Sequence, residues 1–320
     1  MFRFLTRRLL SALAVLFLAS IVIFLLIRLT PGDPAVTLAG PNASPHVLET
    51  IRSELGLDQS LVSQYLNWIG SVVTFDLGRS YVIGGEVGSL ITTGLGNTAL
   101  LAGAALFLAS LLAFTASLAA VILRRRWFDS IMAVANTSAL AVPTFVTGPL
   151  VILVLAVLFP ILPAGGLPPG GVTAEPVATL EFLILPAVCL ALPAAAGLTR
   201  FLTEGLHSQM EQPYVMTARA LGIPRRRIVL RQALPNVLPS AITVLGIQCG
   251  YLLGGTVLIE AIFAWPGLGQ LAGQAITDRD YPLVQALLLL SVTVFVVVQL
   301  ITDVLHAYLD PRVRVDGASA

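Results

Sequence analysis

The stretch YVMTARALGIPRRRIVLRQALPNVLP, residues 214–239, contains five arginines and lies between two long apolar runs. The sequence Gly222-Ile223-Pro224 interrupts it just before the densest group of charges. The rest of the chain is strongly apolar: of 320 residues, 57% are hydrophobic and only 11% are charged, and the mean hydropathy is +0.91. A water-soluble domain cannot bury so much apolar surface, so the composition indicates a membrane protein.

Six apolar runs are long enough to cross a hydrocarbon core about 30 Å thick at 1.5 Å per helical residue. They are Leu9–Ile27, Ala99–Leu123, Ile131–Phe159, Phe182–Thr199, Val237–Phe263 and Leu283–Leu305. The first run is too long for the apolar part of a signal peptide and ends in Arg-Leu-Thr-Pro, so we interpret it as a retained first span. Internal prolines predict kinks in the third and fourth runs.

The arginines predict the orientation of these spans. Placing the N-terminus in the cytoplasm puts 14 of the 18 arginines on the cytoplasmic side. Cytoplasmic loops carry an excess of Lys and Arg, so we expect both termini to be cytoplasmic. The predicted fold is therefore an all-α, polytopic membrane protein with six transmembrane helices.

The same reading divides the chain into segments. Residues 1–29 form the first span, residues 30–98 an external helical subdomain, residues 99–310 the core with a cytoplasmic loop at 200–236, and residues 311–320 a short polar tail, expected to be disordered. Two helices are expected in the external part. The first begins at Ser44-Pro45 and includes Leu55, with Gly56 as its C-cap. The second presents one apolar face formed by Leu61, Val62, Tyr65, Leu66, Ile69, Val72 and Val73.

The cytoplasmic loop has a pattern that positive charge alone does not explain. Tyr214 to Leu221 favours a short helix, which Gly222 ends and which Pro224 prevents from continuing. A second helix is expected to begin at the arginine cluster and to run toward Leu234-Pro235. Such a short helix would lie across the cytoplasmic ends of the spans. A cytoplasmic partner that binds it could move two spans together.

This loop resembles the EAA loop of permease subunits of ATP-binding cassette (ABC) importers. Ala218, Gly222 and Leu234-Pro235 match that pattern, whereas Met216 and Gln232 stand where it has Glu and Ile. Three further stretches are similar to the first permease subunit of dipeptide, oligopeptide and nickel importers. They are RRLLSALAVLFLASIVIFLLIRLTPGDPA (7–35), SELGLDQSLVSQYLNWIGSVVTFDLGRSY (53–81), and GGTVLIEAIFAWPGLGQL (254–271) with RDYPLVQ (279–285).

The resemblance implies a type I ABC importer permease in a bacterial cell membrane, forming half of a pathway for di- or oligopeptides. Its expected partners are a second homologous permease, two ATPase subunits that bind ATP and Mg²⁺, an external substrate-binding protein and the lipid bilayer. No cofactor in this chain and no nucleic acid are expected. The coupling helix that contacts the ATPase would include Tyr214, Thr217, Ala218, Arg219, Ala220, Leu221, Gly222 and Pro224.

Polar side chains within spans are costly, and they mark candidate functional positions. Pathway or gate candidates are Asn136, Gln248, Glu260 and Trp265, although Asn136 and Gln248 could instead only bond across helices. Gln299 and Asp303 are further polar residues, and Asp303 is expected to be a structural partner for cytoplasmic arginines. Asp76, Arg79 and Asp280 are candidates for docking the external binding protein.

Other classes of protein fit the sequence less well. All 18 basic residues are arginine, so the chain has no lysine with which to build an ATP-binding P-loop, and ATP hydrolysis is expected in partner subunits. No His-Glu-x-x-His or Gly-x-Ser-x-Gly motif indicates an intramembrane enzyme. An ion-gradient-driven transporter remains an alternative, and so do nickel chelates, glutathione or haem-like molecules as cargo.

Overall fold

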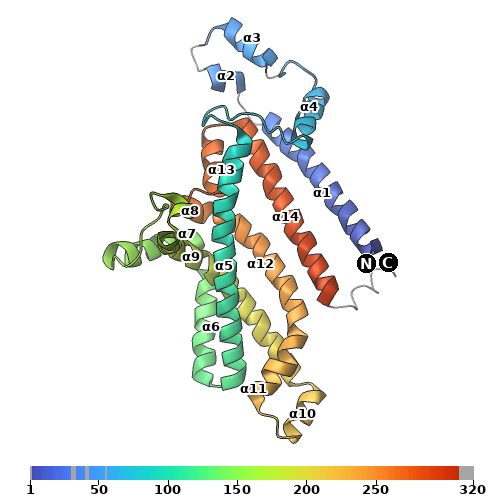
Figure 1. Ribbon diagram of the computed structural model, residues 1–320, viewed down its shortest axis with the longest axis vertical. Helices are drawn as coiled ribbons and strands as arrows, with labels where there is room; N and C mark the ends of the chain where they lie inside the picture. The colour runs from blue at the N-terminus through green and yellow to red at the C-terminus, as the bar shows by residue number, and fades with distance from the viewer. Residues whose placement is uncertain (1, 30–33, 40–42, 55, 310–320) are drawn as a thin grey trace. The chain divides into compact units, whose positions relative to one another are not determined.

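The computed structural model describes residues 2–29, 34–39, 43–54 and 56–309, and these residues form helices and connecting turns. Figure 1 labels the helices in chain order. They are α1 (Phe2–Leu29), α2 (Pro34–Ala39), α3 (Pro45–Glu54), α4 (Leu61–Val73), α5 (Val87–Leu123), α6 (Arg126–Ala141), α7 (Thr144–Ile152), η1 (Leu153–Leu158), α8 (Gly171–Ala174), α9 (Pro176–Met210), α10 (Pro213–Ala220), α11 (Arg225–Ile228), η2 (Val229–Ala233), α12 (Leu234–Ile262), α13 (Leu268–Thr277) and α14 (Tyr281–Leu309). The described residues form no strand beyond one isolated bridge, between Arg79 and Glu86. The all-helical class predicted from the sequence is confirmed.

Five helical segments are long and apolar enough to cross a membrane. They are Thr6–Leu29, Val87–Leu123, Pro176–Met210, Arg225–Leu252 and Tyr281–Leu305. A sixth candidate consists of two helices, Arg126–Ala141 and Thr144–Leu158, that bend by 105° where they meet. The third predicted run, Ile131–Phe159, is therefore not one continuous helix.

The bend has a local cause in Pro143. Val142 adopts an extended conformation, with φ −88° and ψ 117°, and Pro143 precedes the first residue of α7. A proline disfavours the helical conformation of the residue before it and supplies no backbone N–H. By contrast, α9 continues as one helix through Pro186 and Pro193.

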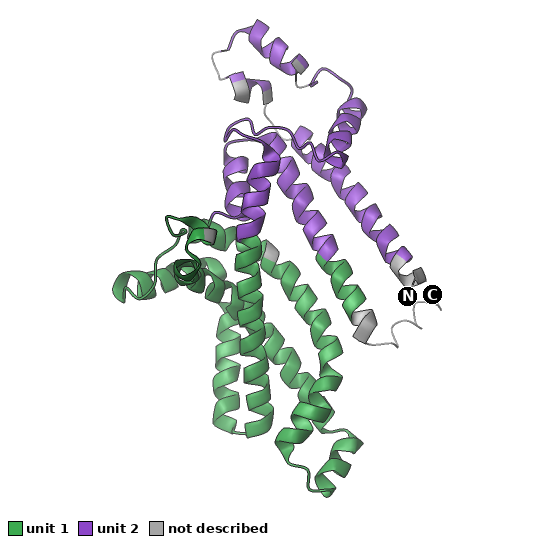
Figure 2. Cartoon of the chain, in the orientation of Figure 1, with its two compact units in different colours: residues 1–5, 98–265, 298–320 green, residues 6–97, 266–297 purple. Residues whose placement is uncertain are grey.

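The described chain forms two compact units, coloured separately in Figure 2. Unit 1 comprises residues 1–5, 98–265 and 298–320, and its core is built on α9. Sixteen residues of α9 are buried, and α9 packs against α6, α7 and α12. Small residues on α5 and α9, including Ala105, Ala109, Ala191 and Ala194, are buried in the core of unit 1.

Unit 2 comprises residues 6–97 and 266–297. Its core joins the start of α5 to α13 and α14 through Val87, Ile91, Ala275 and Leu283, among others. The two helices expected after Ser44-Pro45 and along Leu61 to Val73 are confirmed as α3 and α4. Gly56 follows α3 with φ +63°, and the Ser60 hydroxyl caps α4 by accepting a bond from the Ser63 N–H at 3.2 Å.

Two details of the predicted segments differ from the structure. Helix α5 begins at Val87, so the end of the expected external subdomain belongs to a spanning helix. The predicted cytoplasmic loop, 200–236, is itself helical, because α9 continues to Met210 before α10 begins. Leu55 and the predicted tail at 311–320 lie outside the described residues.

Candidate coupling and pathway sites

Helix α10 has clear start and stop signals in the sequence. Gln212 is extended, and Pro213 occupies the first helical position, where its fixed φ is favourable and no donor is lost. After the helix, Gly222 adopts φ +73°, a left-handed conformation that glycine enters without a side-chain penalty. Pro224 is extended and directly precedes Arg225, the first residue of α11. The short helix predicted around residues 214–221 is confirmed.

One face of α10 is anchored in unit 1. Val215 is 0% exposed and Ala218 is 4% exposed, and their spacing of three residues places them on the same side of the helix. Both belong to a core cluster with Leu206, Met210 and Ile228. Among the predicted coupling residues, Ala218 therefore packs α10 against the core of unit 1 and does not face outward.

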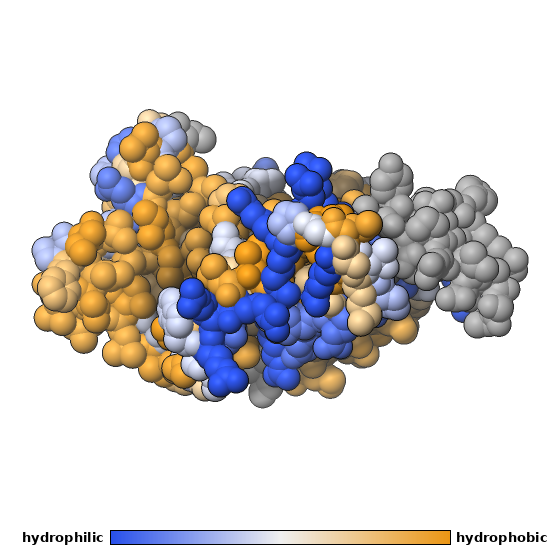
Figure 3. All heavy atoms as spheres, turned by 90° about the horizontal axis from the view of Figure 1, so that it is seen from below, coloured by the Kyte–Doolittle hydropathy of each residue, from blue (hydrophilic) through white to orange (hydrophobic). Residues whose placement is uncertain are grey.

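The other face of α10 exposes apolar side chains. Met216 is 69% exposed and Leu221 is 75% exposed, and Thr217, Arg219 and Ala220 are exposed beside them. Viewed from the end at which α10 and α11 lie, hydrophilic residues gather around this region (Figure 3). Apolar side chains that project from a hydrophilic end of a protein are typical of a surface that a partner covers.

The helix predicted to begin at the arginine cluster and to run toward Leu234-Pro235 is confirmed, and it continues further than expected. Helix α11, the π-helical turn η2 and α12 follow one another directly from Arg225 to Ile262, so the cluster is the first turn of a spanning helix. Arg225 is also a structural residue, because its Nε donates to the carbonyl oxygen of Val121, near the end of α5, at 2.8 Å. Arg226 and Arg227 are exposed.

Polar contacts join α10 to its neighbours. The Tyr214 hydroxyl donates to Gln209 Oε1 at 2.9 Å, and Asn236 Nδ2 lies 3.4 Å from the Tyr214 oxygen. Tyr214 therefore links the end of α9, α10 and the start of α12.

Two pathway candidates are buried at one end of α12. Glu260 and Trp265 are each 0% exposed. Glu260 Oε1 accepts a hydrogen bond from Thr98 Oγ1 at 2.7 Å, and the Glu260 carbonyl accepts one from the Trp265 N–H at 2.9 Å. Glu260 thus joins α5 to α12 and fixes the turn after α12. Sequence reasoning missed Thr98, because an isolated threonine in an apolar run gives no signal.

The remaining pathway candidates are half-buried. Asn136 lies on α6 and Gln248 on α12. A Cβ atom built on Gly197 of α9 would lie 2.9 Å from Gln248 Nε2, so Gln248 lies where α9 and α12 approach closely. On α14, Asp303 Oδ1 accepts a weak hydrogen bond from Gln299 Nε2 at 3.4 Å.

The three docking candidates differ in exposure. Asp76 and Arg79 are exposed, whereas Asp280 is 0% exposed. Asp280 Oδ2 accepts hydrogen bonds from the Ser80 hydroxyl and from the Val82 N–H, the latter at 3.2 Å. Since the side chain of Asp280 is inside unit 2, it holds the Ser80 loop and does not form a contact surface. Ser80 is a second residue that sequence reasoning missed.

No group of three or more His, Cys, Asp or Glu residues that could hold a metal occurs in the part of the chain described. The two cysteines, Cys189 and Cys249, are free thiols, and Cys189 is buried in the core of unit 1.

These features define a class: a helical, multi-pass membrane protein with a short helix exposed at the end of its spanning helices. A family model described as "Binding-protein-dependent transport system inner membrane component" matches residues 105–315. The N-terminal model of the same transport systems matches residues 1–92. The chain belongs to this family of binding-protein-dependent inner-membrane transport components.

Curated relatives agree over the full length. The "Glutathione transport system permease protein GsiC" of Escherichia coli (strain K12) is 34% identical over 314 residues, covering 98% of this chain and 99% of the relative. The protein of the same name from Shigella flexneri serotype 5b (strain 8401) is 33% identical with the same coverage. The chain is therefore a permease subunit of an ABC importer in the inner membrane. It is not an enzyme, because the ATPase is a separate subunit.

A solved structure supports the fold. The MetNI methionine ABC transporter, in an inward-facing conformation, contains a chain that superposes with a TM-score of 0.53 at 20% sequence identity. The match covers 69% of this chain and 96% of that chain.

Proposed function

We propose that this chain forms half of a membrane pathway for short peptides that an external binding protein delivers. A second permease of the same fold would form the other half, and two ATPase subunits would drive transport. The similarity to glutathione permeases along nearly the whole chain supports a peptide cargo, because glutathione is itself a small peptide carrying free carboxylates. Glutathione is the specific alternative within this class.

The exposed face of α10 is the observation that carries the coupling part of the proposal. Met216 and Leu221 are exposed on a helix that Val215 and Ala218 fasten to unit 1. A helix that is packed against the core on one face and exposes apolar side chains on the other can bind in a groove on an ATPase. Arg219 can form two hydrogen bonds with a carboxylate in that groove. Thr217, Ala220, Gly222 and Pro224 complete the proposed contact region.

The proposed orientation places α10 and both termini in the cytoplasm. It rests on the arginine bias and on the need for α10 to reach cytoplasmic ATPases. Asn136 and Gln248 are proposed to line the pathway. Glu260 and Trp265, which are buried, are proposed to stabilise the structure around its outer end. Asp76 and Arg79 are proposed to contact the binding protein, with the buried Asp280 supporting their loop.

The decisive experiment reconstitutes the complete importer in proteoliposomes and measures ATP hydrolysis and peptide uptake with the binding protein present. Leu221→Ser should lower both rates at least about tenfold by weakening the ATPase contact, as truncation of a central apolar interface residue does. Leu123→Ser is the matched control, because Leu123 is also an exposed leucine but lies at the end of α5. Equal rates for the two variants would refute the coupling role of α10. Uptake driven by an ion gradient without ATP would refute the importer mechanism.

A further inference from the structure

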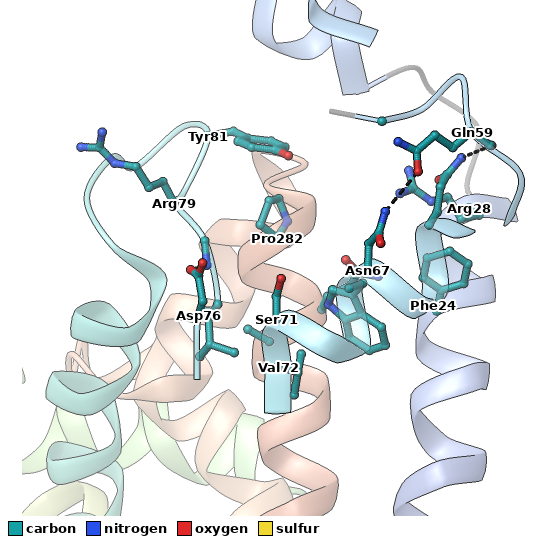
Figure 4. A pocket seen from close by; sticks show the side chains of 17 residues that line it. Phe24, Arg28, Gln59, Asn67, Ser71, Val72, Asp76, Arg79, Tyr81 and Pro282 are labelled. Atoms are coloured by element: carbon teal, nitrogen blue, oxygen red, sulfur yellow. Dashed lines mark hydrogen bonds between the residues drawn. The ribbon is translucent and has the colours of Figure 1, made fainter. Parts of the chain in front are cut away.

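A polar pocket in unit 2 includes Asp76 and Arg79, the two exposed docking candidates, together with residues that no site above uses. It encloses about 300 Å³, at the lower end of the range for small-molecule sites. Its walls come from the end of α1, the turn before α4, α4 itself, the loop after α4 and the start of α14. Figure 4 shows Arg28 and Gln59 on one side, above Phe24, with Asp76 and Tyr81 across the pocket.

Arg28 provides a positive charge at the wall of this pocket. The guanidinium lies over the Phe24 ring at 5.4 Å from its centroid, and its Nε is buried without a hydrogen-bond partner among the described residues. A buried donor without a partner is costly, and a charged donor more so. An anionic acceptor in the pocket would satisfy this group.

The position of Arg28 is fixed by an aromatic cluster. Phe24 lies 5.5 Å from the Tyr65 ring and 6.0 Å from the Trp68 ring, and the Tyr65 and Ser20 hydroxyl oxygens are 2.9 Å apart. These contacts join α4 to α1 and limit the positions that the guanidinium can take. Arg28 is thus pre-organised to bind a ligand in the pocket.

The same pocket contains an acceptor that is also available. Gln64 Nε2 donates to the Gln59 carbonyl oxygen at 2.8 Å, but Gln64 Oε1 is buried and has no partner in the described chain. The Gln59 side-chain oxygen already accepts a hydrogen bond from Asn67 Nδ2, at 3.1 Å. The free acceptor of Gln64 therefore suits an N–H donor on a ligand.

Asp76 adds a negative charge to the opposite wall, and its Oδ1 accepts only the Gly78 N–H, at 3.1 Å, among the hydrogen bonds described. Burial raises the pKa of the neighbouring Tyr81, so its hydroxyl stays protonated at neutral pH and can donate or accept a hydrogen bond. The pocket thus presents a cation on one side, an anion on the other and an unused amide acceptor. This arrangement is complementary to a small zwitterion with a carboxylate, an ammonium group and an internal N–H.

We propose that this pocket is an external binding site for the free termini of a short peptide, with Arg28 binding the carboxylate and Asp76 facing the ammonium group. The inference rests on the peptide transport proposed above and adds a site on the permease itself. A peptide released by the binding protein would bind here on the external side of unit 2.

The test uses the complete importer, without binding protein, in nanodiscs made only of phosphatidylcholine. Tritiated trialanine is the probe, and it competes with unlabelled trialanine, its C-terminal amide and its N-acetyl derivative. Wild-type protein should bind the free acid about tenfold more tightly than the amide, since a charge-assisted hydrogen bond is lost. Arg28→Gln should bind the acid about tenfold more weakly than wild type and should no longer distinguish it from the amide. Arg52→Gln, on α3 and outside the pocket lining, should behave like wild type.

Several results would overturn the inference. One is that wild-type protein binds the acid and the amide equally well, a result that does not depend on any variant folding. Another is that Arg28→Gln still binds the acid more tightly than the amide. Asp76→Asn should in the same way remove the preference for trialanine over its N-acetyl form. Loss of trialanine binding in discs containing phosphatidylethanolamine would assign the pocket instead to a lipid headgroup with a primary ammonium group, which phosphatidylcholine lacks. Uptake of the same peptide with binding protein and ATP separates the two proposals: uptake without pocket binding refutes only the pocket, and absence of uptake refutes the peptide transport.

Discussion

Arg225 Nε donates a hydrogen bond to the carbonyl oxygen of Val121 at 2.8 Å, across 104 positions of the chain. The bond ties the first turn of α11 to the last turns of α5. A positive charge is also favourable near the carboxyl end of a helix, because of the helix dipole. The bond gives one arginine of a charged cluster a structural role that its neighbours do not share.

Replacing Arg225 with alanine should therefore destabilise unit 1 by about 1–2 kcal/mol, the value of a charged hydrogen bond at a partly exposed site. Arg226→Ala is the matched control, because Arg226 is adjacent and exposed. Heating the detergent-purified importer and measuring the remaining monodisperse fraction by size exclusion would compare them. Equal thermal midpoints would mean that the Arg225 bond contributes nothing to stability.

Gly222 is the second position at which backbone geometry restricts the residue. Its φ is +73°, and a Cβ atom there would meet nothing within 4 Å. Any cost of Gly222→Ala therefore comes from the backbone and not from a clash, and should be about 1–2 kcal/mol. Gly222→Asn should cost less, because asparagine tolerates the left-handed conformation better.

The readout for Gly222 is the coupling ratio, the number of peptides imported per ATP hydrolysed. Alanine should lower this ratio more than asparagine, because strain at residue 222 shifts the Leu221 end of α10. The reverse order would show that the left-handed turn does not position the coupling helix.

The Thr98–Glu260 pair separates two interpretations of a buried acid. If Glu260 acts by accepting the Thr98 hydrogen bond, Glu260→Gln should retain transport, since the amide oxygen can still accept. Thr98→Val should be more harmful, because it leaves a buried acceptor without this donor at a cost of about 1–3 kcal/mol. Transport assays in proteoliposomes would rank the variants. Transport lost in Glu260→Gln but kept in Thr98→Val would favour a proton-carrying role for Glu260.

The sequence was sufficient for features that local chemistry determines. Pro213, Gly222 and Pro224 bound α10, Gly56 ends α3, and hydrophobic runs mark the spanning helices. The resemblance in the loop at 214–239 indicated the correct family. In each case the signal lies within a few residues of the feature.

Features that depend on distant residues could not be predicted. Thr98 and Glu260 are 162 positions apart, and Ser80 and Asp280 are 200 apart, so no local pattern announces either pair. The same limit explains why Asp280 was expected on a surface: an Asp beside Arg279 and Tyr281 in a loop gives no sign of burial. Pro143 signalled a break in the third run, but a proline does not specify the 105° angle between the two helices.

Gly165 provides the sharpest steric prediction. A Cβ atom on this residue would lie 2.1 Å from the carbonyl oxygen of Phe263 and 2.7 Å from its carbonyl carbon, both backbone atoms that cannot rotate away. The adjacent Gly166 N–H donates to the same oxygen at 2.7 Å. Gly165→Ala should thus separate the loop from the end of α12, break this bond and destabilise the protein by about 1–3 kcal/mol.

Gly273→Ala is the control, because a Cβ atom on that helical glycine meets nothing within 4 Å. This variant should be neutral or slightly more stable than wild type. Thermal midpoints of the purified importer would compare the two, and a Gly165→Ala protein as stable as the Gly273→Ala protein would show that the loop does not pack on α12 in this way.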